Sequence, residues 1–368
     1  TDHRQRPAHR PAEILQADLA PLALELALWG VGDPAELAWL DPPPAAAWDQ
    51  AVDLLRALEA IDGAGVITGT GRRMAGLPLH PRLAHLLALS PPDAIAIAAD
   101  LAALLSERDP AVRQPDGPGS TDLGGRLQAL AAHRDRRSTP GFDRGRLAGI
   151  ARASAQLRRL VNERQTSTES ARAGRSAAPA RAGAAAAAAE ATPGELLALA
   201  YPDRIAQRRG RAQDQGRYLL ADGSGAVLPR GDALVVHRYL VIADLAAGSG
   251  DQRIRAALPI DEAELRQRLE ERIERRMTQH WDEALGAVVA RDETRLGALL
   301  LDSQPVPIRD VDAAQRLLLA AVARDLGGAL DWTDSARQLQ ARVELARRQE
   351  PSAGWPDLSD EWLAAHGS

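Results

Sequence analysis

The sequence contains no lysine, although it has 45 basic residues, all of which are arginine. A phosphate-binding loop of the form GxxxxGKS or GxxxxGKT places a lysine at the nucleotide phosphates, and Schiff-base enzymes use a lysine amine as the nucleophile. The composition therefore excludes an ordinary nucleotide-hydrolysing motor site and a Schiff-base enzyme within this chain. Because alanine is abundant while Phe and Asn each occur once, we attribute the missing lysine to a high-GC coding bias.

Cysteine is also absent, which excludes disulfides and thiolate metal sites. Aromatic residues make up only 3% of the chain. No apolar run approaches the roughly 20 residues of a membrane-spanning helix, and residues 1–11 lack the apolar core of a secretory signal. These absences predict a cytoplasmic protein that has no membrane partner.

The rest of the composition is that of a soluble globular protein with 368 residues, 45% of them hydrophobic and 26% charged. This length predicts two to four domains. The formal net charge is −5, but residues 134–175 contain eleven arginines and four acidic residues, a local charge of +7. Such a block is typical of a phosphate-binding surface, and equally of a solvated arginine-rich helix face.

Residues 12–80 show the pattern of a winged-helix-like domain. Apolar residues recur at helical spacing over 12–30 and again over 45–61, and a short helix is predicted between them from Asp33 to Trp39. The β-branched Val66, Ile67 and Thr68 between glycines predict a short ribbon, the wing. The last helix carries Asp49, Asp53 and Glu59, so we expect it to pack against its neighbours instead of reading a DNA groove.

Residues 81–165 predict a helical bundle, with helices over 83–89, 94–107, 123–132 and 143–162 and a Pro/Gly loop over 109–121. Residues 166–194 are rich in alanine and have no apolar face to bury. They predict a flexible linker.

The hydrophobic period changes in residues 195–260, where five short β-prone runs are separated by Gly/Asp turns and predict a small β-barrel. Residues 261–368 predict an α+β domain. It begins with a charged helix over 261–277, continues with a hairpin over 281–301, and ends with helices over 311–326 and 335–348. The predicted fold is therefore multidomain and mainly α-helical with one small barrel.

Several separate blocks of the chain resemble the region that follows the two motor domains of DEAH-box helicases, most closely the bacterial branch called HrpB. The matching blocks, in the order of that family, are Glu13–Leu19, Leu22–Gly30, Trp39–Pro44, Gly71–Leu87, Leu197–Gly210 and Gly216–Pro229. The resemblance covers most of the chain outside residues 110–120 and 166–195.

The resemblance implies a specific domain order. Residues 1–11 would end the connector from the second motor domain, 81–165 would be the ratchet domain that leans on single-stranded RNA, and 195–260 would be an OB-fold. Residues 261–368 would be an HrpB-type C-terminal domain, cut short or unusually brief. ATP and magnesium would bind the upstream motor domains of the parent helicase, and we expect no cofactor, metal or catalytic residue in this chain.

The candidate nucleic-acid-binding residues lie in the predicted ratchet and barrel. They are Arg158, Arg159, Arg204, Arg208, Arg209, Arg211, Arg217 and Tyr218. The arginines would contact phosphates, whereas Tyr218 either stacks on a base or packs in the barrel core, since the faces of its strand cannot be assigned from the sequence.

These observations predict the accessory half of an ATP-dependent RNA helicase, which binds single-stranded nucleic acid and couples it to the motor. The chain alone should bind RNA weakly and hydrolyse nothing. RNA and DNA are not distinguished, because a groove that contacts phosphates and stacks bases barely separates them. The alternative is a protein-interaction module that does not bind nucleic acid directly.

Overall fold

The computed structural model describes residues 12–112, 120–173, 191–210, 216–246, 250–324, 333–360 and 362. The chain divides into two compact units, Thr1–Glu270 and Glu271–Ser368. None of the described helices is long and apolar enough to cross a membrane.

The first part of unit 1 is a small helical domain. Its elements are η2 (Glu13–Leu15), α1 (Ala20–Trp29), η3 (Pro34–Glu36), α2 (Ala45–Ala57) and α3 (Gly69–Ala75). The predicted helix over 12–30 is thus split, because Pro21 begins a new helix after the short η2 turn. The predicted helix from Asp33 to Trp39 is only the single turn of η3.

The predicted wing is shorter than a ribbon. It consists of one antiparallel bridge between Ile61 and Ile67, after which Thr68 caps α3 by accepting a hydrogen bond from the Gly71 amide at 3.0 Å. Gly71 packs so closely on the preceding turn that a Cβ there would lie 2.1 Å from the Ala60 carbonyl oxygen. The close approach of these two segments explains the glycine.

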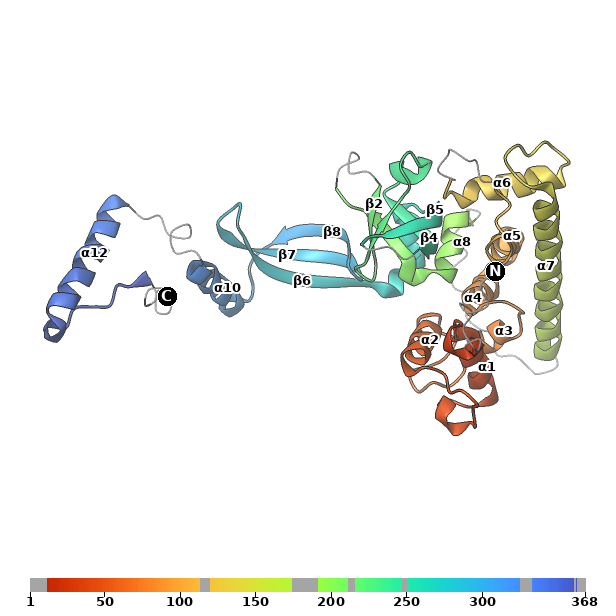
Figure 1. Cartoon of the computed structure of the whole chain (residues 1–368), viewed down its shortest axis with the longest axis horizontal. Coiled ribbons are helices and arrows are strands. Elements are labelled where there is room, and N and C mark those ends of the chain that lie inside the picture. Colours follow the sequence, from red (N-terminus) through yellow and green to blue (C-terminus); the bar gives the residue numbers. More distant parts are fainter. Residues whose placement is uncertain are drawn as a thin grey trace, which may run out of the picture. The chain divides into compact units, whose positions relative to one another are not determined.

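A bundle of longer helices follows. Its elements are α4 (Pro81–Leu89), η4 (Pro92–Ala94), α5 (Ile95–Ser106), α6 (Leu123–Arg134) and α7 (Arg144–Ala173), and α7 packs along α5 and α6 (Figure 1). Four predicted helices are therefore present. The predicted linker is wrong for residues 166–173, which continue α7, because a segment without Gly or Pro that follows a packed helix can extend it. Residues 174–190 of the predicted linker lie outside the described part of the chain.

The barrel in residues 205–259 is closed by five strands in the order β1-β2-β3-β5-β4. The strands are β1 (Ile205–Arg208), β2 (Arg217–Leu220), β3 (Gly225–Val227), β4 (Tyr239–Ala246) and β5 (Gln252–Pro259). The helices around them are α8 (Pro193–Ala200), η5 (Pro202–Arg204), η6 (Ala233–Val236) and α9 (Glu262–Arg268). The predicted small barrel is confirmed. One of the five β-prone runs was expected over 233–243, but its first four residues, 233–236, form a 3-10 turn and β4 begins at Tyr239.

Tyr218 belongs to the core of this barrel. It is 0% exposed and packs with Leu220, Ile254 and other apolar side chains. Its hydroxyl donates to the carbonyl oxygens of His237 at 2.8 Å and Leu234 at 3.1 Å, and burial raises its pKa to about 12. The prediction that Tyr218 contacts nucleic acid is therefore wrong for this structure, and core packing is the correct alternative.

Arg82 joins the helical bundle to the barrel region. Its guanidinium pairs in a bidentate manner with Asp203, at 2.6 and 2.8 Å, and donates to the Ala200 carbonyl oxygen at 3.1 Å. It also lies 5.0 Å from the ring centre of Tyr201. His85, one turn further along α4, approaches the Leu199 carbonyl oxygen at 2.7 Å. These contacts attach α4 to the segment that leads into β1.

Unit 2 contains the three-stranded antiparallel sheet β6-β7-β8 and further helices. Its elements, with η7 at the boundary, are η7 (Glu270–Arg272), β6 (Ile273–Asp282), β7 (Ala287–Leu296), β8 (Leu299–Val306), α10 (Val311–Arg324), α12 (Asp334–Gln349) and η8 (Pro351–Ala353). The predicted hairpin and the two following helices are present. Residues 261–270 belong with unit 1, which moves the predicted domain boundary by ten residues.

The predicted helix over 261–277 is wrong beyond Arg268. A capping box between Asp261 and Glu264 begins α9, but residues 273–282 form β6, which pairs with β7 over its whole length. The helical propensity of Glu, Arg and Met is overridden by this long-range ladder.

We predict that Arg82→Gln destabilises unit 1 by about 2 kcal/mol at neutral pH. The substitution leaves the Asp203 carboxylate partly desolvated and without its partner. The loss of stability is smaller than for a fully buried pair because the Asp203 side chain is 40% exposed. Urea unfolding measures the loss, and Arg73→Gln, a change at an exposed arginine, is the control.

The pH dependence of this loss has a defined sign. Burial raises the pKa of Asp203, but the hydrogen bonds and charge of Arg82 outweigh it, so its pKa lies below the ordinary value of 3.8. The pair therefore stabilises the fold above pH 3.8, and this contribution is lost as the pH falls through the folded-state pKa. A difference between wild type and Arg82→Gln that stays constant from pH 7 to pH 3 would contradict the assignment.

We predict that Tyr218→Phe lowers the free energy of unfolding by about 1 to 2 kcal/mol, because two buried carbonyl oxygens lose the hydroxyl donor. The nucleic-acid affinity of the folded variant should equal that of wild type, as measured by fluorescence anisotropy. A reduced affinity with an intact fold would return Tyr218 to the binding surface.

Candidate nucleic-acid interface

The predicted binding arginines divide into structural and exposed ones. Arg204 donates to the Ala243 carbonyl oxygen at 3.0 Å and lies 5.3 Å from the ring centre of Tyr201. Arg208 donates to the carbonyl oxygens of Val235 at 2.8 Å and Val236 at 3.1 Å. The guanidinium groups of both arginines are thus held by backbone carbonyls of the barrel region.

Arg158, on α7, is part of a polar cluster inside the bundle. Asp100 of α5 accepts hydrogen bonds from Arg158 at 2.9 Å, from both terminal nitrogens of Arg134 at 2.6 Å, and from the Ser154 hydroxyl. Burial raises the pKa of Asp100, but these hydrogen bonds outweigh it and lower the pKa below its ordinary value. Arg158 therefore joins α5 to α7, whereas its neighbour Arg159 is exposed.

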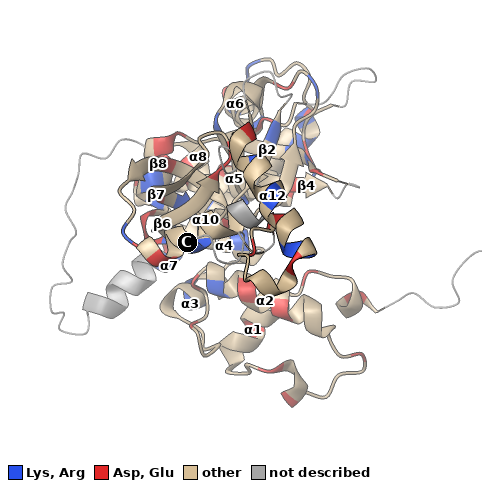
Figure 2. Ribbon diagram, turned by 90° about the vertical axis from the view of Figure 1, so that its left-hand side faces the viewer, with Lys and Arg blue, Asp and Glu red and all other residues tan. Residues whose placement is uncertain are grey.

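Several arginines of residues 134–175 already have hydrogen-bond or ion-pair partners. Arg134 and Arg158 share Asp100, Arg137 pairs with Asp135 at 2.8 Å, and Arg146 donates to the Asp109 carbonyl oxygen at 2.8 Å. The bundle consequently presents fewer available arginines than the sequence indicated. Charges of both signs are distributed over the ribbon, and α2 carries acidic residues as predicted (Figure 2).

Arg209 and Arg217 lie side by side on the outer face of the barrel. The Arg209 amide donates to the Arg217 carbonyl oxygen at 2.8 Å, which extends the pairing of β1 with β2 by one residue. Arg209 is exposed and the Arg217 side chain is 66% exposed. Arg211 lies outside the described residues.

The same row continues onto two further strands. Arg217 pairs with Val227 on β3, and Val227 pairs with Arg253 on β5. Arg253 is exposed, while the next residue, Ile254, points into the core. Since neighbouring strands lie about 4.8 Å apart, Arg209, Arg217 and Arg253 form a line across four strands, which we call the arginine row.

The arginine row has the geometry and charge of a phosphate-binding surface. Among the described residues, Asp251 approaches Arg217 at 4.0 Å, the outer limit of an ion pair. Three guanidinium groups on one rigid row can each donate two hydrogen bonds to a phosphate. Arg253 was not among the predicted residues, yet the alternation of arginine with apolar residues in Arg253-Ile254-Arg255 was a signal for an outward position.

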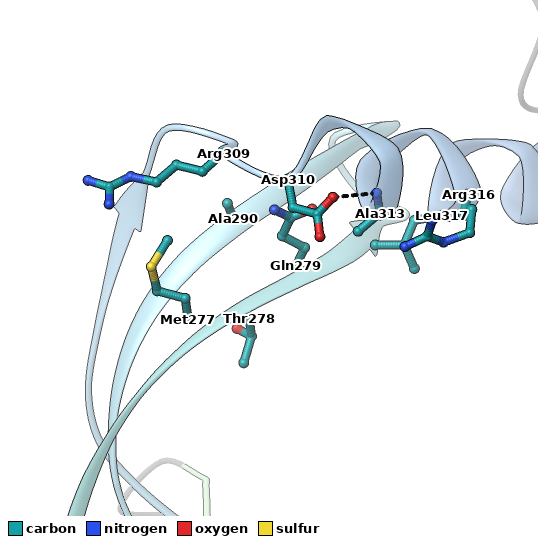
Figure 3. A pocket seen from close by; sticks show the side chains of 9 residues that line it. All are labelled: Met277, Thr278, Gln279, Ala290, Arg309, Asp310, Ala313, Arg316 and Leu317. Carbon is teal, nitrogen blue, oxygen red and sulfur yellow. Dashed lines mark hydrogen bonds between the residues drawn. The ribbon is translucent and has the colours of Figure 1, made fainter.

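A hollow in unit 2 is an alternative site. It lies between α10 and strands β6 and β7 and is lined by Met277, Gln279, Arg309 and Arg316, among others (Figure 3). Asp310 accepts a hydrogen bond from the Ala313 amide at 2.9 Å and so already caps α10 (Figure 3). The lining contains no nucleophile with a paired base, so the hollow has no catalytic constellation.

Metal sites are not found in the described part of the chain, where no three His, Cys, Asp or Glu side chains gather closely enough to hold an ion. His80 caps α4 and contacts Asp18 at 3.1 Å, and His85 is buried against α8. The two histidines therefore have structural roles.

Comparison with known proteins identifies two segments by family. Residues 272–306, the sheet of unit 2, match the model of the ATP-dependent RNA helicase HrpB connector region. Residues 51–79 match the winged-helix model of the helicase associated domain, HA2, which confirms the predicted winged helix despite its short wing. A 78-residue stretch is also 37% identical to the pre-mRNA-splicing factor ATP-dependent RNA helicase prp22 of Schizosaccharomyces pombe, and it covers 21% of this chain and 7% of that protein.

One relative matches nearly the whole chain. The ATP-dependent RNA helicase HrpB of Escherichia coli K12 is 35% identical over 362 residues, which cover 97% of this chain and 39% of the relative. Two crystal structures of E. coli HrpB, titled as a DExH-box NTPase and a DEAH/RHA helicase, superpose with TM-scores of 0.61 at 34% and 31% identity. They match 98% and 97% of this chain, and the chain spans 39% and 40% of their lengths. The chain is therefore a homologue of the C-terminal region of HrpB-type helicases.

Proposed function

We propose that this chain is the nucleic-acid-binding accessory part of a DEAH-box RNA helicase, which holds a single strand while motor domains of the same protein hydrolyse ATP. The observation that carries the proposal is the arginine row on the outer face of the closed barrel. In the proposed protein, ATP and magnesium would bind the motor domains, because this chain has no lysine for an ordinary phosphate-binding loop.

The topology of the barrel supports a role in binding single strands. A five-stranded Greek-key barrel with strand order β1-β2-β3-β5-β4 is the arrangement of an OB-fold, whose face over strands 2 and 3 binds oligonucleotides. Arg217 on β2 and Val227 on β3 occupy this face, and Arg209 and Arg253 flank them. Guanidinium contacts to phosphates fix a strand without reading its bases, so we expect little sequence preference.

The proposal that the chain couples nucleic acid to a motor rests on its relatives. E. coli HrpB is named an ATP-dependent RNA helicase, and this chain spans about two fifths of its length. A region that holds the strand on a rigid surface would prevent the strand from slipping back between motor steps. The bundle helices α4 to α7 would act with the barrel in this ratchet, and exposed Arg159 remains a candidate contact on α7.

A second function is favoured by exposed apolar residues of the winged-helix domain. Trp29 is 74% exposed and Leu40 is 99% exposed. Large exposed apolar side chains mark protein contacts more often than nucleic-acid contacts. A protein-interaction module is therefore the competing proposal.

We predict that replacing Arg209, Arg217 and Arg253 together by Gln weakens binding of a labelled single-stranded RNA about a hundredfold at about 0.1 M salt. Each lost phosphate contact removes about 0.7 from the slope of log affinity against log salt, so the slope should fall by about 2. Fluorescence anisotropy of the full chain over a salt series measures both quantities.

A triple replacement of the exposed Arg56, Arg73 and Arg342 by Gln is the matched control, because it removes the same charge from residues that are not part of the barrel. It should leave the salt slope near the wild-type value. An equal loss in both triple variants would show a non-specific charge effect. The absence of RNA binding by wild type would favour the protein-interaction module.

A further inference from the structure

Residues 81–270 offer few places where a base could stack. This part of the sequence has four aromatic residues, namely Phe142 and three tyrosines. The tyrosines are Tyr201, Tyr218 and Tyr239, and they are 8%, 0% and 2% exposed. The arginine row can therefore hold phosphates, but the barrel presents no tyrosine face to a base. Phe142, the only phenylalanine of the chain, is half-buried and lies in the helical bundle.

Phe142 lines a hollow of about 480 Å³ beside α6. The floor is made by small residues on one face of that helix, since Gly125, Ala129 and Ala132 recur at helical spacing and all line the hollow. The volume falls within the range of small-ligand sites. A Cβ built on Gly125 would meet no atom within 4 Å, so the space above this glycine is open.

The opposite wall is a turn of fixed shape. Thr139-Pro140-Gly141-Phe142 is closed by a hydrogen bond from the Phe142 amide to the Thr139 carbonyl oxygen at 3.2 Å. Gly141 has φ = 81°, as the third position of a type II turn requires, and Pro140 fixes the second. Arg136, which precedes the turn, has a left-handed φ of 59°, a strained conformation for a residue with a side chain. The backbone of Phe142 is thereby held in place before any ligand arrives.

A buried polar group of the same wall lacks a partner. Thr139 lines the hollow and is 8% exposed, and its hydroxyl has no hydrogen-bond partner within the described residues. Such orphaned hydroxyls are rare in folded proteins and call for an explanation. The side chain of Gln128 adds an amide to the lining, and Arg137 adds a cation that already pairs with Asp135 at 2.8 Å. An aromatic ring and an amide are groups with which proteins bind an unstacked base.

We propose that the hollow of α6 and the 139–142 turn receives one base of the bound single strand, which stacks on Phe142. This proposal rests on the function proposed above and deepens it. The barrel holds the strand by its phosphates, and the bundle holds it by a base. A free mononucleotide has the same chemistry, so the experiment must separate the two sources.

The experiment compares two labelled RNA strands of equal length, one unmodified and one with abasic sites throughout, on the full chain at about 0.1 M salt. We expect wild type to bind the unmodified strand about tenfold more tightly, the effect of one stacked base. Phe142→Leu keeps the apolar contacts of the ring with the turn and should bind both strands with the abasic affinity. A 2-aminopurine strand should be quenched by wild type and not by Phe142→Leu.

Gly125→Leu gives an independent test that does not threaten the fold. The added Cβ meets no atom within 4 Å, the rest of the side chain extends toward the hollow, and replacing a helical glycine should raise the melting temperature. We expect this more stable variant to lose the tenfold preference as well. Preservation of that preference in either variant would overturn the proposal.

The remaining outcomes separate the two proposals. The triple replacement of the arginine row should weaken both strands equally and preserve their tenfold ratio. Equal affinity of wild type for both strands would overturn the base site while the phosphate surface stands. Failure to bind either strand would overturn both proposals. AMP and UMP are tested as free mononucleotides on wild type and on Phe142→Leu. If wild type bound one of them as tightly as the RNA strand, and Phe142→Leu did not, the hollow would be a mononucleotide site and its assignment to the strand would be wrong.

Discussion

The bidentate pair between Arg82 and Asp203 is the contact on which the arrangement of unit 1 depends. Arg82 is 8% exposed, and its guanidinium meets a carboxylate, a backbone carbonyl and the face of Tyr201 at once. Arg204 lies near the same tyrosine ring, so two guanidinium groups approach it. The negative charge of the Asp203 carboxylate partly balances their positive charge. An arginine with this many partners can be buried because its planar fork satisfies them together. The bundle and the barrel are consequently held as one body.

A second attachment fixes α6 to the barrel. The amide and hydroxyl of Thr121 both donate to one oxygen of the buried Asp232, each at 2.9 Å, and the other oxygen caps η6 through the Leu234 amide. The Thr121 carbonyl oxygen accepts from Ala257 on β5 at 2.9 Å. The helix that forms the floor of the Phe142 hollow thus begins at the barrel wall. A strand that engaged both the hollow and the arginine row would contact two surfaces of fixed separation, as a device that resists backward slipping requires.

Local patterns were sufficient for much of this fold, and the failures have physical causes. The helices of the bundle and the period-2 strands of the barrel follow from apolar spacing, which burial then enforces. Residues 273–277 resemble a charged helix by composition, but their pairing partners lie about 20 residues away on β7, where no local pattern can show them. Tyr218 illustrates the same limit at the level of a side chain. Its strand has an inner and an outer face, and only the closure of the barrel decides which face the ring occupies.

The binding surface was harder to predict than the fold because arginine serves two purposes in a chain without lysine. Counting charges identified residues 134–175 as a candidate phosphate-binding surface. In the structure, however, Arg134 and Arg158 donate hydrogen bonds to Asp100, and Arg208 donates to backbone carbonyls. Lysine has one compact and strongly hydrated charge, so it rarely occupies buried positions that require several hydrogen-bond donors. In a homologue rich in lysine, the buried structural cations would be arginines and many of the exposed cations would be lysines. Here the separation comes from strand geometry. Arg217 and Arg253 are each followed by a core residue, Tyr218 and Ile254, and Arg209 lies opposite Arg217. This alternation, unlike the charge count, places the three exposed arginines on one face.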